Sequence, residues 1–128
     1  MKYLLDAQAL LWFINGDKRL PGKYRDIFAK SSNQIFISLV TIWEIGIKNA
    51  IGKLSIKGNL QEFVKKEIEG YNFYYMDIRL NHIIEATSLP MHHRDPFDRL
   101  LIAQSRLENI PVISSDLSFD KYGITRIW

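Results

Sequence analysis

The sequence predicts one α/β domain over residues 1–128, with a central, mostly parallel sheet of about five strands. Short runs rich in β-branched and aromatic residues alternate with segments of helical periodicity, which is the pattern of layered α/β proteins. The first of these runs reads as a strand that is buried on both faces. A chain of 128 residues buries roughly two-thirds of its unfolded surface around a single core.

Two strands, each leading into helical sequence, are expected in the amino-terminal part. The expected elements are, in order, the strand Lys2–Asp6, the helices Ala9–Asn15 and Pro21–Ser31, the strand Gln34–Ser38 and the helix Leu39–Ile51. Gly16 ends the first helix, because glycine readily takes the left-handed conformation that closes a helix. Pro21 suits the first turn of the second helix, where its missing N–H is no loss.

The remainder of the chain is expected to add three helices and three strands. They are the helix Asn59–Glu69, the strand Tyr71–Ile78, the helices Leu80–Leu89 and Pro96–Asn109, and the strands Ile110–Ser114 and Gly123–Trp128. Asn59 and Glu62 are spaced as a capping box, and Gly70 stops that helix. The strand that follows is rich in aromatic residues, which is typical of a strand with one core face and one edge. Stacking on nucleobases is the alternative interpretation.

Composition limits the functional classes. Hydrophobic residues make up 47% and charged residues 24% of the chain, as in ordinary soluble globular proteins. The absence of cysteine excludes disulfides and thiolate metal sites, and we expect a cytoplasmic protein. No apolar run approaches the ~18 residues of a membrane span, and Asp6 and Gln8 interrupt the apolar start too early for a signal peptide. The net charge of +3 permits a nucleic-acid partner without requiring one.

Acidic residues occur at four positions where a core normally excludes charge. Each lies at the end of an apolar segment or inside one: Asp6, Glu44, Asp98 and Asp116. Asp6 and Asp116 follow expected strands, and ligands of parallel α/β sheets bind beyond the carboxyl ends of the strands. Glu44 lies on the apolar stripe of its helix, and Asp98 borders another. A lone buried charge is costly, so acids at such places are usually paired, cap a helix or bind a cation.

Each of these acids also has a structural explanation. Asp6 is a good amino-terminal cap for the helix that follows it. Glu44 belongs to a helix so apolar that some charge must fall on any face. Asp98 occupies the third position of a helix that Asp95 caps, which is favourable for the helix dipole. Asp116 lies in a turn sequence where aspartate is common. For Asp98 the structural and functional readings are compatible, because a helix start aimed at the crevice also presents its carboxylate there.

Taken together, the four carboxylates predict a divalent-metal site. Unit charges ~4 Å apart repel by about 4 kcal/mol at an effective dielectric near 20, so gathered carboxylates need cations or protons. Oxygen ligands favour Mg²⁺ or Mn²⁺, which activate water in phosphodiester hydrolysis. Asp95 and Ser114 are candidate supporting residues. Candidate phosphate contacts are Arg94, Arg99 and Lys48, and each of these equally fits a solvated surface charge.

Other chemistry-bearing residues are less informative. The adjacent His92 and His93 are a poor arrangement for chelating one metal ion and have no cysteine partners. We expect them in a loop near the site, within reach of a phosphate. The sequence contains no glycine-rich phosphate loop and no nucleophile elbow.

Four segments resemble, in order, the motifs of the PIN-domain family, and more narrowly those of the VapC-type ribonuclease toxins of bacterial toxin–antitoxin systems. The segments are Tyr3–Trp12, Ser38–Ile45, Leu89–Gln104 and Val112–Asp116. The resemblance spans the full length, and its third segment is highly specific. It implies a three-layer α/β/α domain, with Asp6, Glu44, Asp98 and Asp116 on the family's metal-binding positions. Ser114 falls on the family's usual threonine or serine.

The same resemblance implies an activity and partners. The activity is Mg²⁺- or Mn²⁺-dependent endonucleolytic cleavage of RNA. The partners are a second copy of the chain, in a homodimer formed through a helical face, or a small antitoxin that covers the site and inhibits it in a hetero-oligomer. One departure is notable, because the family often has threonine-histidine after the first aspartate and this chain has Ala7-Gln8.

Two other functions are compatible with the sequence. Ala7-Gln8 removes a small hydroxyl near the metal, which favours a catalytically weakened PIN fold that acts as an RNA- or protein-binding module. An aspartyl-phosphate phosphatase would use Asp6 as its nucleophile. That mechanism usually requires a second acid two residues further on, where this chain has Gln8.

Overall fold

A five-stranded sheet forms the centre of the computed structural model, which describes residues 1–128. The strands are β1 (Lys2–Leu5), β2 (Gln34–Ser38), β3 (Tyr74–Met76), β4 (Val112–Ile113) and β5 (Arg126–Ile127). Their order across the sheet is β3-β2-β1-β4-β5, and every pairing is parallel. The expected α/β class is therefore confirmed, and the sheet is parallel throughout.

The helices fall close to where the sequence predicts them. They are α1 (Ala7–Ile14), α2 (Gly22–Ala29), α3 (Leu39–Ala50), α4 (Leu60–Val64) with the π-helical continuation η1 (Lys65–Glu69), α5 (Leu80–Ser88), α6 (Pro96–Glu108) and the 3₁₀ helix η2 (Leu117–Tyr122). The Asn59 side chain accepts a hydrogen bond from the Glu62 N–H at 2.9 Å and so caps α4, whereas the Glu62 carboxylate accepts from the Asn59 side-chain amide and not from its backbone, so the expected capping box is only half formed. No helix is both long and apolar enough to cross a membrane.

The structure differs from the expected elements in several details, and the last two strands are shorter than expected, at Val112–Ile113 and Arg126–Ile127. The strand expected over Tyr71–Ile78 is confined to Tyr74–Met76, because the chain still turns at Asn72, where φ is +59°. It is an edge strand, as its aromatic composition predicted. The 3₁₀ helix Leu117–Tyr122 was not predicted. It begins at Asp116, whose side chain accepts from the Ser118 N–H, a local bond that favours a tight turn over an extended chain.

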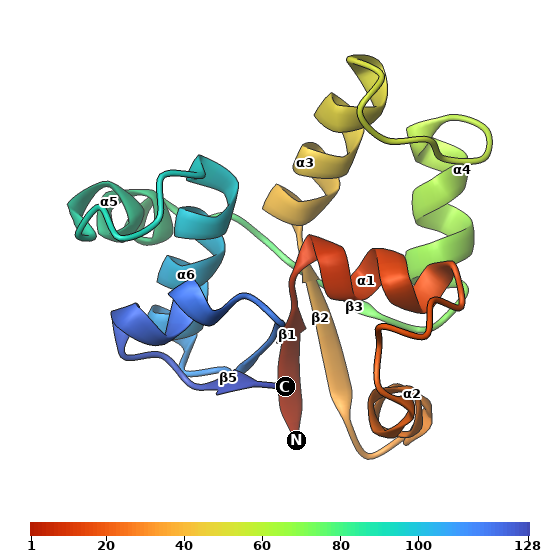
Figure 1. The fold of residues 1–128 in the computed structure, drawn as a ribbon, viewed down its shortest axis with the longest axis horizontal. Helices are drawn as coiled ribbons and strands as arrows, with labels where there is room; N and C mark the ends of the chain where they lie inside the picture. Colours follow the sequence, from red (N-terminus) through yellow and green to blue (C-terminus); the bar gives the residue numbers. More distant parts are fainter.

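Helices cover both faces of the sheet, so the domain has three layers (Figure 1). On one face α1, α2 and α4 bury side chains such as Leu10, Tyr24 and Phe63 against the sheet. On the other face α5, α6 and η2 form a second core that includes Ile102 and Phe119. Successive strand residues point to opposite faces and therefore contribute to different cores. The three-layer α/β/α architecture expected from the resemblance is confirmed.

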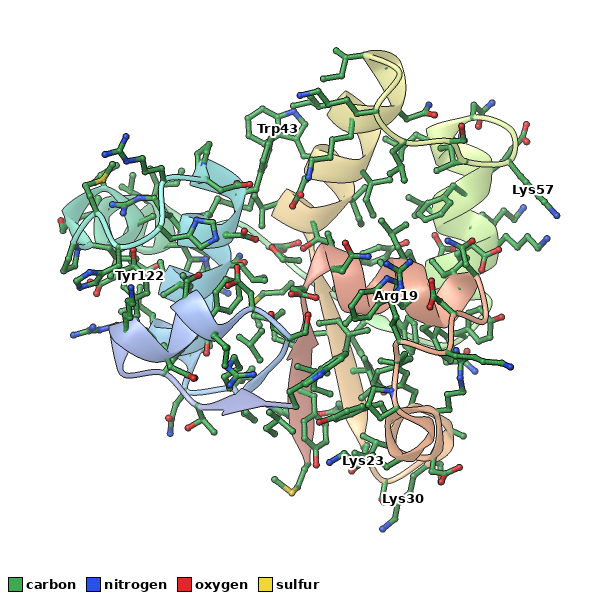
Figure 2. All side chains as sticks on the ribbon, in the orientation of Figure 1. Arg19, Lys23, Lys30, Trp43, Lys57 and Tyr122 are labelled. Atoms are coloured by element: carbon green, nitrogen blue, oxygen red, sulfur yellow. The ribbon has the colours of Figure 1, made fainter.

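The carboxyl ends of all the strands meet at one edge of the sheet. In the central strand β1, Leu5 pairs with Ile37 of β2 and with Ile113 of β4, so the residues that follow these three positions are neighbours. Helix α3 stands at this edge and contributes Ile45 to one core and Val40 to the other. Several basic side chains lie away from this edge, on the side of the molecule that carries α2 and α4; those labelled in Figure 2 are Arg19, Lys23, Lys30 and Lys57. The sheet edge is therefore the place where segments distant in sequence converge.

Candidate metal centre

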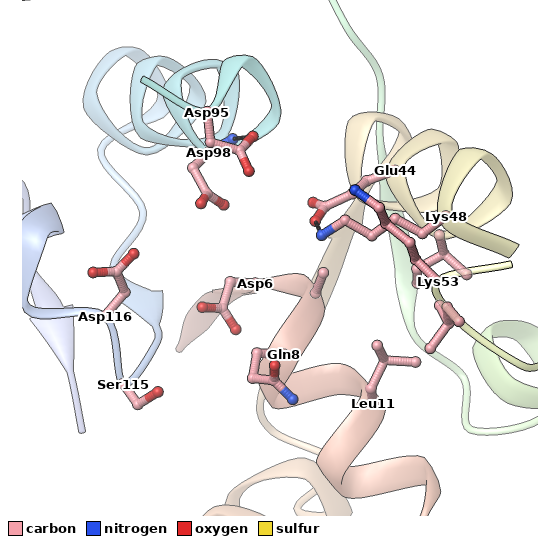
Figure 3. A pocket seen from close by; sticks show the side chains of 13 residues that line it. Asp6, Gln8, Leu11, Glu44, Lys48, Lys53, Asp95, Asp98, Ser115 and Asp116 are labelled. Carbon is pink, nitrogen blue, oxygen red and sulfur yellow. Dashed lines mark hydrogen bonds and ion pairs between the residues drawn. The ribbon is translucent and has the colours of Figure 1, made fainter. Parts of the chain in front are cut away.

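A pocket of about 400 Å³ lies at the carboxyl edge of the sheet. Its charged lining residues are five acids and two lysines: Asp6, Glu44, Asp95, Asp98, Asp116, Lys48 and Lys53. The acids come from the end of β1, from α3, from the start of α6 and from the segment after β4, and they surround one space (Figure 3). The structure thus brings together all four acids that the sequence singled out, together with Asp95.

Asp6 combines a structural role with an unfavourable charge. It ends β1 and caps α1, and its carboxylate accepts from the Ala9 N–H at 2.8 Å. The residue is only 6% exposed. Burial raises the pKa of Asp6 to about 6, although hydrogen bonds from Ser114 and Ala9 oppose the shift, and the charges of Asp116 and Glu44 add to it. The cap explains its place in the sequence, but a cap alone does not require such deep burial.

Glu44 is buried on the face of α3 that looks into the pocket, and Lys48 pairs with it one turn later. The Lys48 Nζ lies 2.5 Å from a Glu44 carboxylate oxygen. This bond raises the pKa of Lys48, and the nearby charges of Asp95 and Asp98 contribute as well. Lys48 was a candidate phosphate contact, and in this structure its ammonium supplies one positive charge to the acidic cluster.

Asp98 faces the pocket from the first turn of α6. The helix is capped by Asp95, which accepts from the N–H groups of Phe97 and Asp98 at 2.8 and 3.3 Å. Burial raises the pKa of Asp98 to about 7, and the charges of Asp95 and Glu44 raise it further, against the opposing effect of His93. Asp95 therefore both builds the helix start and makes ionisation of Asp98 more costly.

Asp116 is held differently. Burial acts to raise its pKa, but hydrogen bonds from the Ser118 hydroxyl and N–H and from His93 outweigh burial, and the pKa lies below its ordinary value. The Ser118 hydroxyl donates at 2.7 Å and the Ser118 N–H at 2.9 Å. The hydroxyl of the buried Ser114 accepts from the Asp116 N–H at 3.0 Å and also lowers the pKa of Asp6. Ser114 thus links the two strand-end aspartates.

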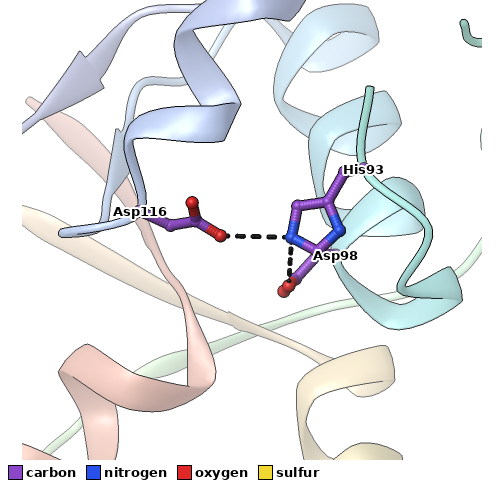
Figure 4. A group of neighbouring side chains, drawn as sticks. All are labelled: His93, Asp98 and Asp116. Atoms are coloured by element: carbon purple, nitrogen blue, oxygen red, sulfur yellow. Dashed lines mark hydrogen bonds and ion pairs between the residues drawn. The ribbon is translucent and has the colours of Figure 1, made fainter. Parts of the chain in front are cut away.

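His93 joins two of the acids, a contact that the sequence did not reveal. Its Nε2 lies 3.0 Å from an Asp98 oxygen and 3.1 Å from an Asp116 oxygen (Figure 4). The three donor atoms are close enough together to hold a metal ion. However, Nδ1 of His93 accepts from the Asp95 N–H at 3.1 Å, so in the neutral ring Nε2 carries the hydrogen. In this arrangement His93 donates to the carboxylates and orients them.

The two arginines proposed as phosphate contacts do not line the pocket. Arg99 is buried, and its guanidinium donates to the carbonyl oxygens of Pro90, His93, Ala86 and Leu89. These bonds close the end of α5 and fix the loop that carries His93. Because the guanidinium is engaged with these carbonyl groups, its role is structural. Arg94 is exposed on that loop. Lys53, which the sequence reading passed over, does line the pocket.

A PIN domain family model matches residues 3–124. The chain belongs to the PIN-domain family. Because the matched region leaves out only a few residues at either end of the chain, it contains every acid of the pocket, from Asp6 to Asp116. None of the curated proteins is significantly similar to this PIN domain in sequence.

Solved structures share the fold of this PIN domain over almost its whole length. VapBC2 from Rickettsia felis, bound to a DNA fragment from its promoter, matches with a TM-score of 0.73 and 18% identity, covering 99% of this chain and 98% of the other. FitAB bound to the IR36 DNA fragment has a TM-score of 0.71 at 12% identity, covering 98% and 93%. FitAcB from Neisseria gonorrhoeae has a TM-score of 0.71 at 13% identity, covering 98% and 96%. At such identities the likeness establishes the fold.

Proposed function

We propose that this PIN domain is a metal-dependent endoribonuclease and the toxin of a toxin–antitoxin pair. The observation that carries the proposal is the convergence of four carboxylates from separate segments on one pocket, where burial raises the pKa of two of them, Asp6 to about 6 and Asp98 to about 7. Such an arrangement is unfavourable on its own and becomes favourable when a cation neutralises it. A structural role alone gives no reason to gather these charges.

The donor set fits Mg²⁺ or Mn²⁺. The inward-facing groups of Asp6, Glu44, Asp98 and Asp116 are carboxylate oxygens, which hard divalent cations prefer. The one ammonium paired inside the cluster, that of Lys48, offsets only part of its negative charge. We therefore assign the ion to these four residues, with Asp95 and Ser114 in support.

When bound, the ion supplies the positive charge that activates water and stabilises the charge developing on a phosphodiester. The chain does the rest. Asp6 and Asp98 must be ionised to act as ligands, and because their pKa values are raised to about 6 and about 7, protons compete with the metal ion as the pH falls through this range. His93 holds Asp98 and Asp116 at hydrogen-bond distance, so that carboxylates from α6 and from the β4 end face the same space.

The proposed partners are an antitoxin and a second copy of the chain. The VapBC2 and FitAB structures, which share this fold, are complexes of two proteins bound to DNA. By analogy, we propose that a small antitoxin covers the acidic pocket in the cytoplasm. An apolar groove between α3 and α5 supports a homodimer, since Trp43 of α3 and Ile83 of α5 both line it and are 59% and 46% exposed.

RNA cleavage tests the proposal. Total RNA is incubated with wild-type protein in Mg²⁺ and then in EDTA, and the ends of the products are mapped. We expect cleavage only with Mg²⁺, and none by Asp98→Asn, which keeps the size of the side chain and removes its charge. Asp26→Asn, at an exposed acid on α2, is the matched control and should cleave normally. Full cleavage by a folded, pure Asp98→Asn preparation contradicts the proposal.

A second candidate rests on Ala7 and Gln8, which line the pocket beside Asp6 at the positions where the family resemblance implies threonine and histidine. In that case the chain is a catalytically weakened PIN fold that binds RNA or protein. Calorimetry with Mn²⁺ separates the two functions. Heat of binding at millimolar Mn²⁺ supports the nuclease, whereas retention of RNA without metal binding supports the module.

A further inference from the structure

Positive charge is distributed unevenly around the acidic pocket. Both lysines that line it, Lys48 and Lys53, extend toward the Glu44 side, whereas Ser115 and Asp116 lie across the pocket from them (Figure 3). An RNA strand is a chain of negative charges and is repelled by the carboxylates around the pocket. The lysine side is where a phosphate next to the cleaved one finds a favourable charge.

The two lysines are not equivalent. Lys48 is committed to Glu44 through the 2.5 Å ion pair, and this bond raises its pKa. Lys53 is exposed, and its ammonium makes no ion pair or hydrogen bond within the domain. Lys53 is therefore the cation at this pocket that is free to bind an anion from solution.

Local structure fixes Lys53 at the pocket rim. Helix α3 ends at Ala50, and Gly52 takes a φ of +79°, a left-handed conformation that side-chain-bearing residues rarely adopt. The chain then folds back, because the N–H groups of Lys53 and Leu54 both donate to the Lys48 carbonyl, at 2.8 and 3.2 Å. Leu54 packs against the core beneath α1 and α3. A helix continued past Ala50 would carry this lysine away from the acids, whereas the turn returns it to them.

We propose that Lys53 is a substrate-binding residue that holds the RNA phosphate next to the cleaved one, on the α3 side of the pocket. This inference rests on the proposed ribonuclease function and adds to it the side on which the strand is held. A lysine ammonium is a compact point charge with several donors, and it binds a phosphate without selecting the base. Lys53 thus contributes to affinity and to the position of the strand, but not to sequence preference.

The test is RNA binding without cleavage. A fluorescein-labelled single-stranded RNA of mixed sequence is titrated with protein in EDTA at several KCl concentrations, with fluorescence anisotropy as the readout. For Lys53→Gln we expect affinity several-fold weaker at low salt and a slope of log affinity against log salt reduced by about 0.7, the value for one single-strand phosphate contact. Lys53→Arg should restore the slope. Lys30→Gln, at the exposed end of α2, should leave it unchanged.

Several results overturn the proposal: an unchanged slope for Lys53→Gln, an equal loss for Lys30→Gln, or no RNA binding by the wild type in EDTA. Because this assay needs neither metal nor cleavage, its outcome is separate from that of the proposed function. A wild type that binds RNA through Lys53 but never cleaves it refutes the nuclease and leaves the phosphate contact standing. If the wild type cleaves, Lys53→Gln should raise KM and leave kcat unchanged, whereas damage to the metal site would lower kcat.

Discussion

Asp6 directly follows β1 and Asp116 lies shortly after the neighbouring strand β4, yet the two carboxylates are held in different environments. Each follows one of two neighbouring parallel strands, and each caps the helix that comes next. Asp6 is buried, and its pKa rises to about 6. The side chain of Asp116 is 40% exposed, and its pKa falls below the ordinary value. The topology alone therefore does not determine the electrostatics of a strand-end carboxylate.

The difference comes from the donors around each carboxylate. Asp116 receives hydrogen bonds from both donors of Ser118 and from His93, so its negative charge is already stabilised. Asp6 has one backbone donor and the Ser114 hydroxyl, under the full effect of burial and two neighbouring acids. A cation gains more at Asp6 than at Asp116. We infer that Asp6 is a principal ligand and that Asp116 mainly orients the site.

The largest expected effect is on catalysis. Asp6→Asn should lower RNA cleavage by more than about 100-fold, whereas Asp116→Asn should lower it by about 10- to 100-fold, the range for residues that orient metal ligands. Asparagine preserves the helix cap in both variants, so the comparison isolates the charge. The difference between the two variants is measured as their rates of RNA cleavage in Mg²⁺. Equal losses for the two variants would remove the distinction between these aspartates.

Stability without metal should change in opposite directions. One pKa unit corresponds to about 1.4 kcal/mol, so ionising Asp6 costs the folded protein on the order of 3 kcal/mol. In EDTA near pH 8, Asp6→Asn should raise the free energy of unfolding by about 2 kcal/mol, and Asp116→Asn should lower it by about 1 kcal/mol. Urea denaturation measures both values. A destabilised Asp6→Asn protein would mean that its carboxylate is not strained in the metal-free fold.

The pH dependence of metal-free stability follows from Asp6 and Asp98. Their pKa values rise from 3.8 to about 6 and about 7, so between these limits the folded protein holds protons that the unfolded chain has released. The stability that these two groups contribute is present below about pH 4 and is lost as pH rises through about 7. Thermal melting in EDTA across this interval should show the fall. Asp6→Asn should make the melting temperature depend less on pH. A wild-type melting temperature that rises throughout this interval would contradict the raised pKa values of Asp6 and Asp98.

The smallest effect is expected from Ser118→Ala. Removing the hydroxyl that donates to Asp116 at 2.7 Å should lower the free energy of unfolding by about 1 kcal/mol and leave cleavage within about tenfold of wild type. The Ser118 N–H and His93 still hold the carboxylate. Urea denaturation and the RNA assay check the two values. A loss of activity as large as that of Asp6→Asn would show that the orientation of Asp116 is more demanding than this account allows.

Much of the fold and the acidic pocket was predictable from sequence, because both depend on local patterns. Periodicity and caps located the helices, and the fact that parallel strands end at one edge indicated that Asp6 and Asp116 are close. Glu44 could be singled out because a charge on an apolar helix face is conspicuous. These inferences need only the order of the helices and strands and the spacing of apolar residues within each of them.

Residues whose roles depend on loop paths were less predictable. His93 was placed near the site, but its bonds to Asp98 and Asp116 depend on a loop held by the buried Arg99. Arg99 was a candidate for a phosphate contact or a solvated surface charge, and its guanidinium instead reaches back from the first turn of α6 to carbonyls of the preceding segment. Lys53 reaches the pocket only through the turn at Gly52. A glycine just after a helix, followed by lysine, was the available signal.

Calorimetric titration of Mn²⁺ into wild type, Asp6→Asn and Asp116→Asn tests the central claim most directly, because it measures cation binding by the acidic pocket without RNA. We expect that wild type binds Mn²⁺ with release of protons, that Asp116→Asn binds it more weakly, and that Asp6→Asn loses binding by more than about 100-fold. Equal binding by all three proteins, or no binding by wild type at millimolar Mn²⁺, would contradict a metal site in which Asp6, a carboxylate that burial makes costly to ionise, is a principal ligand.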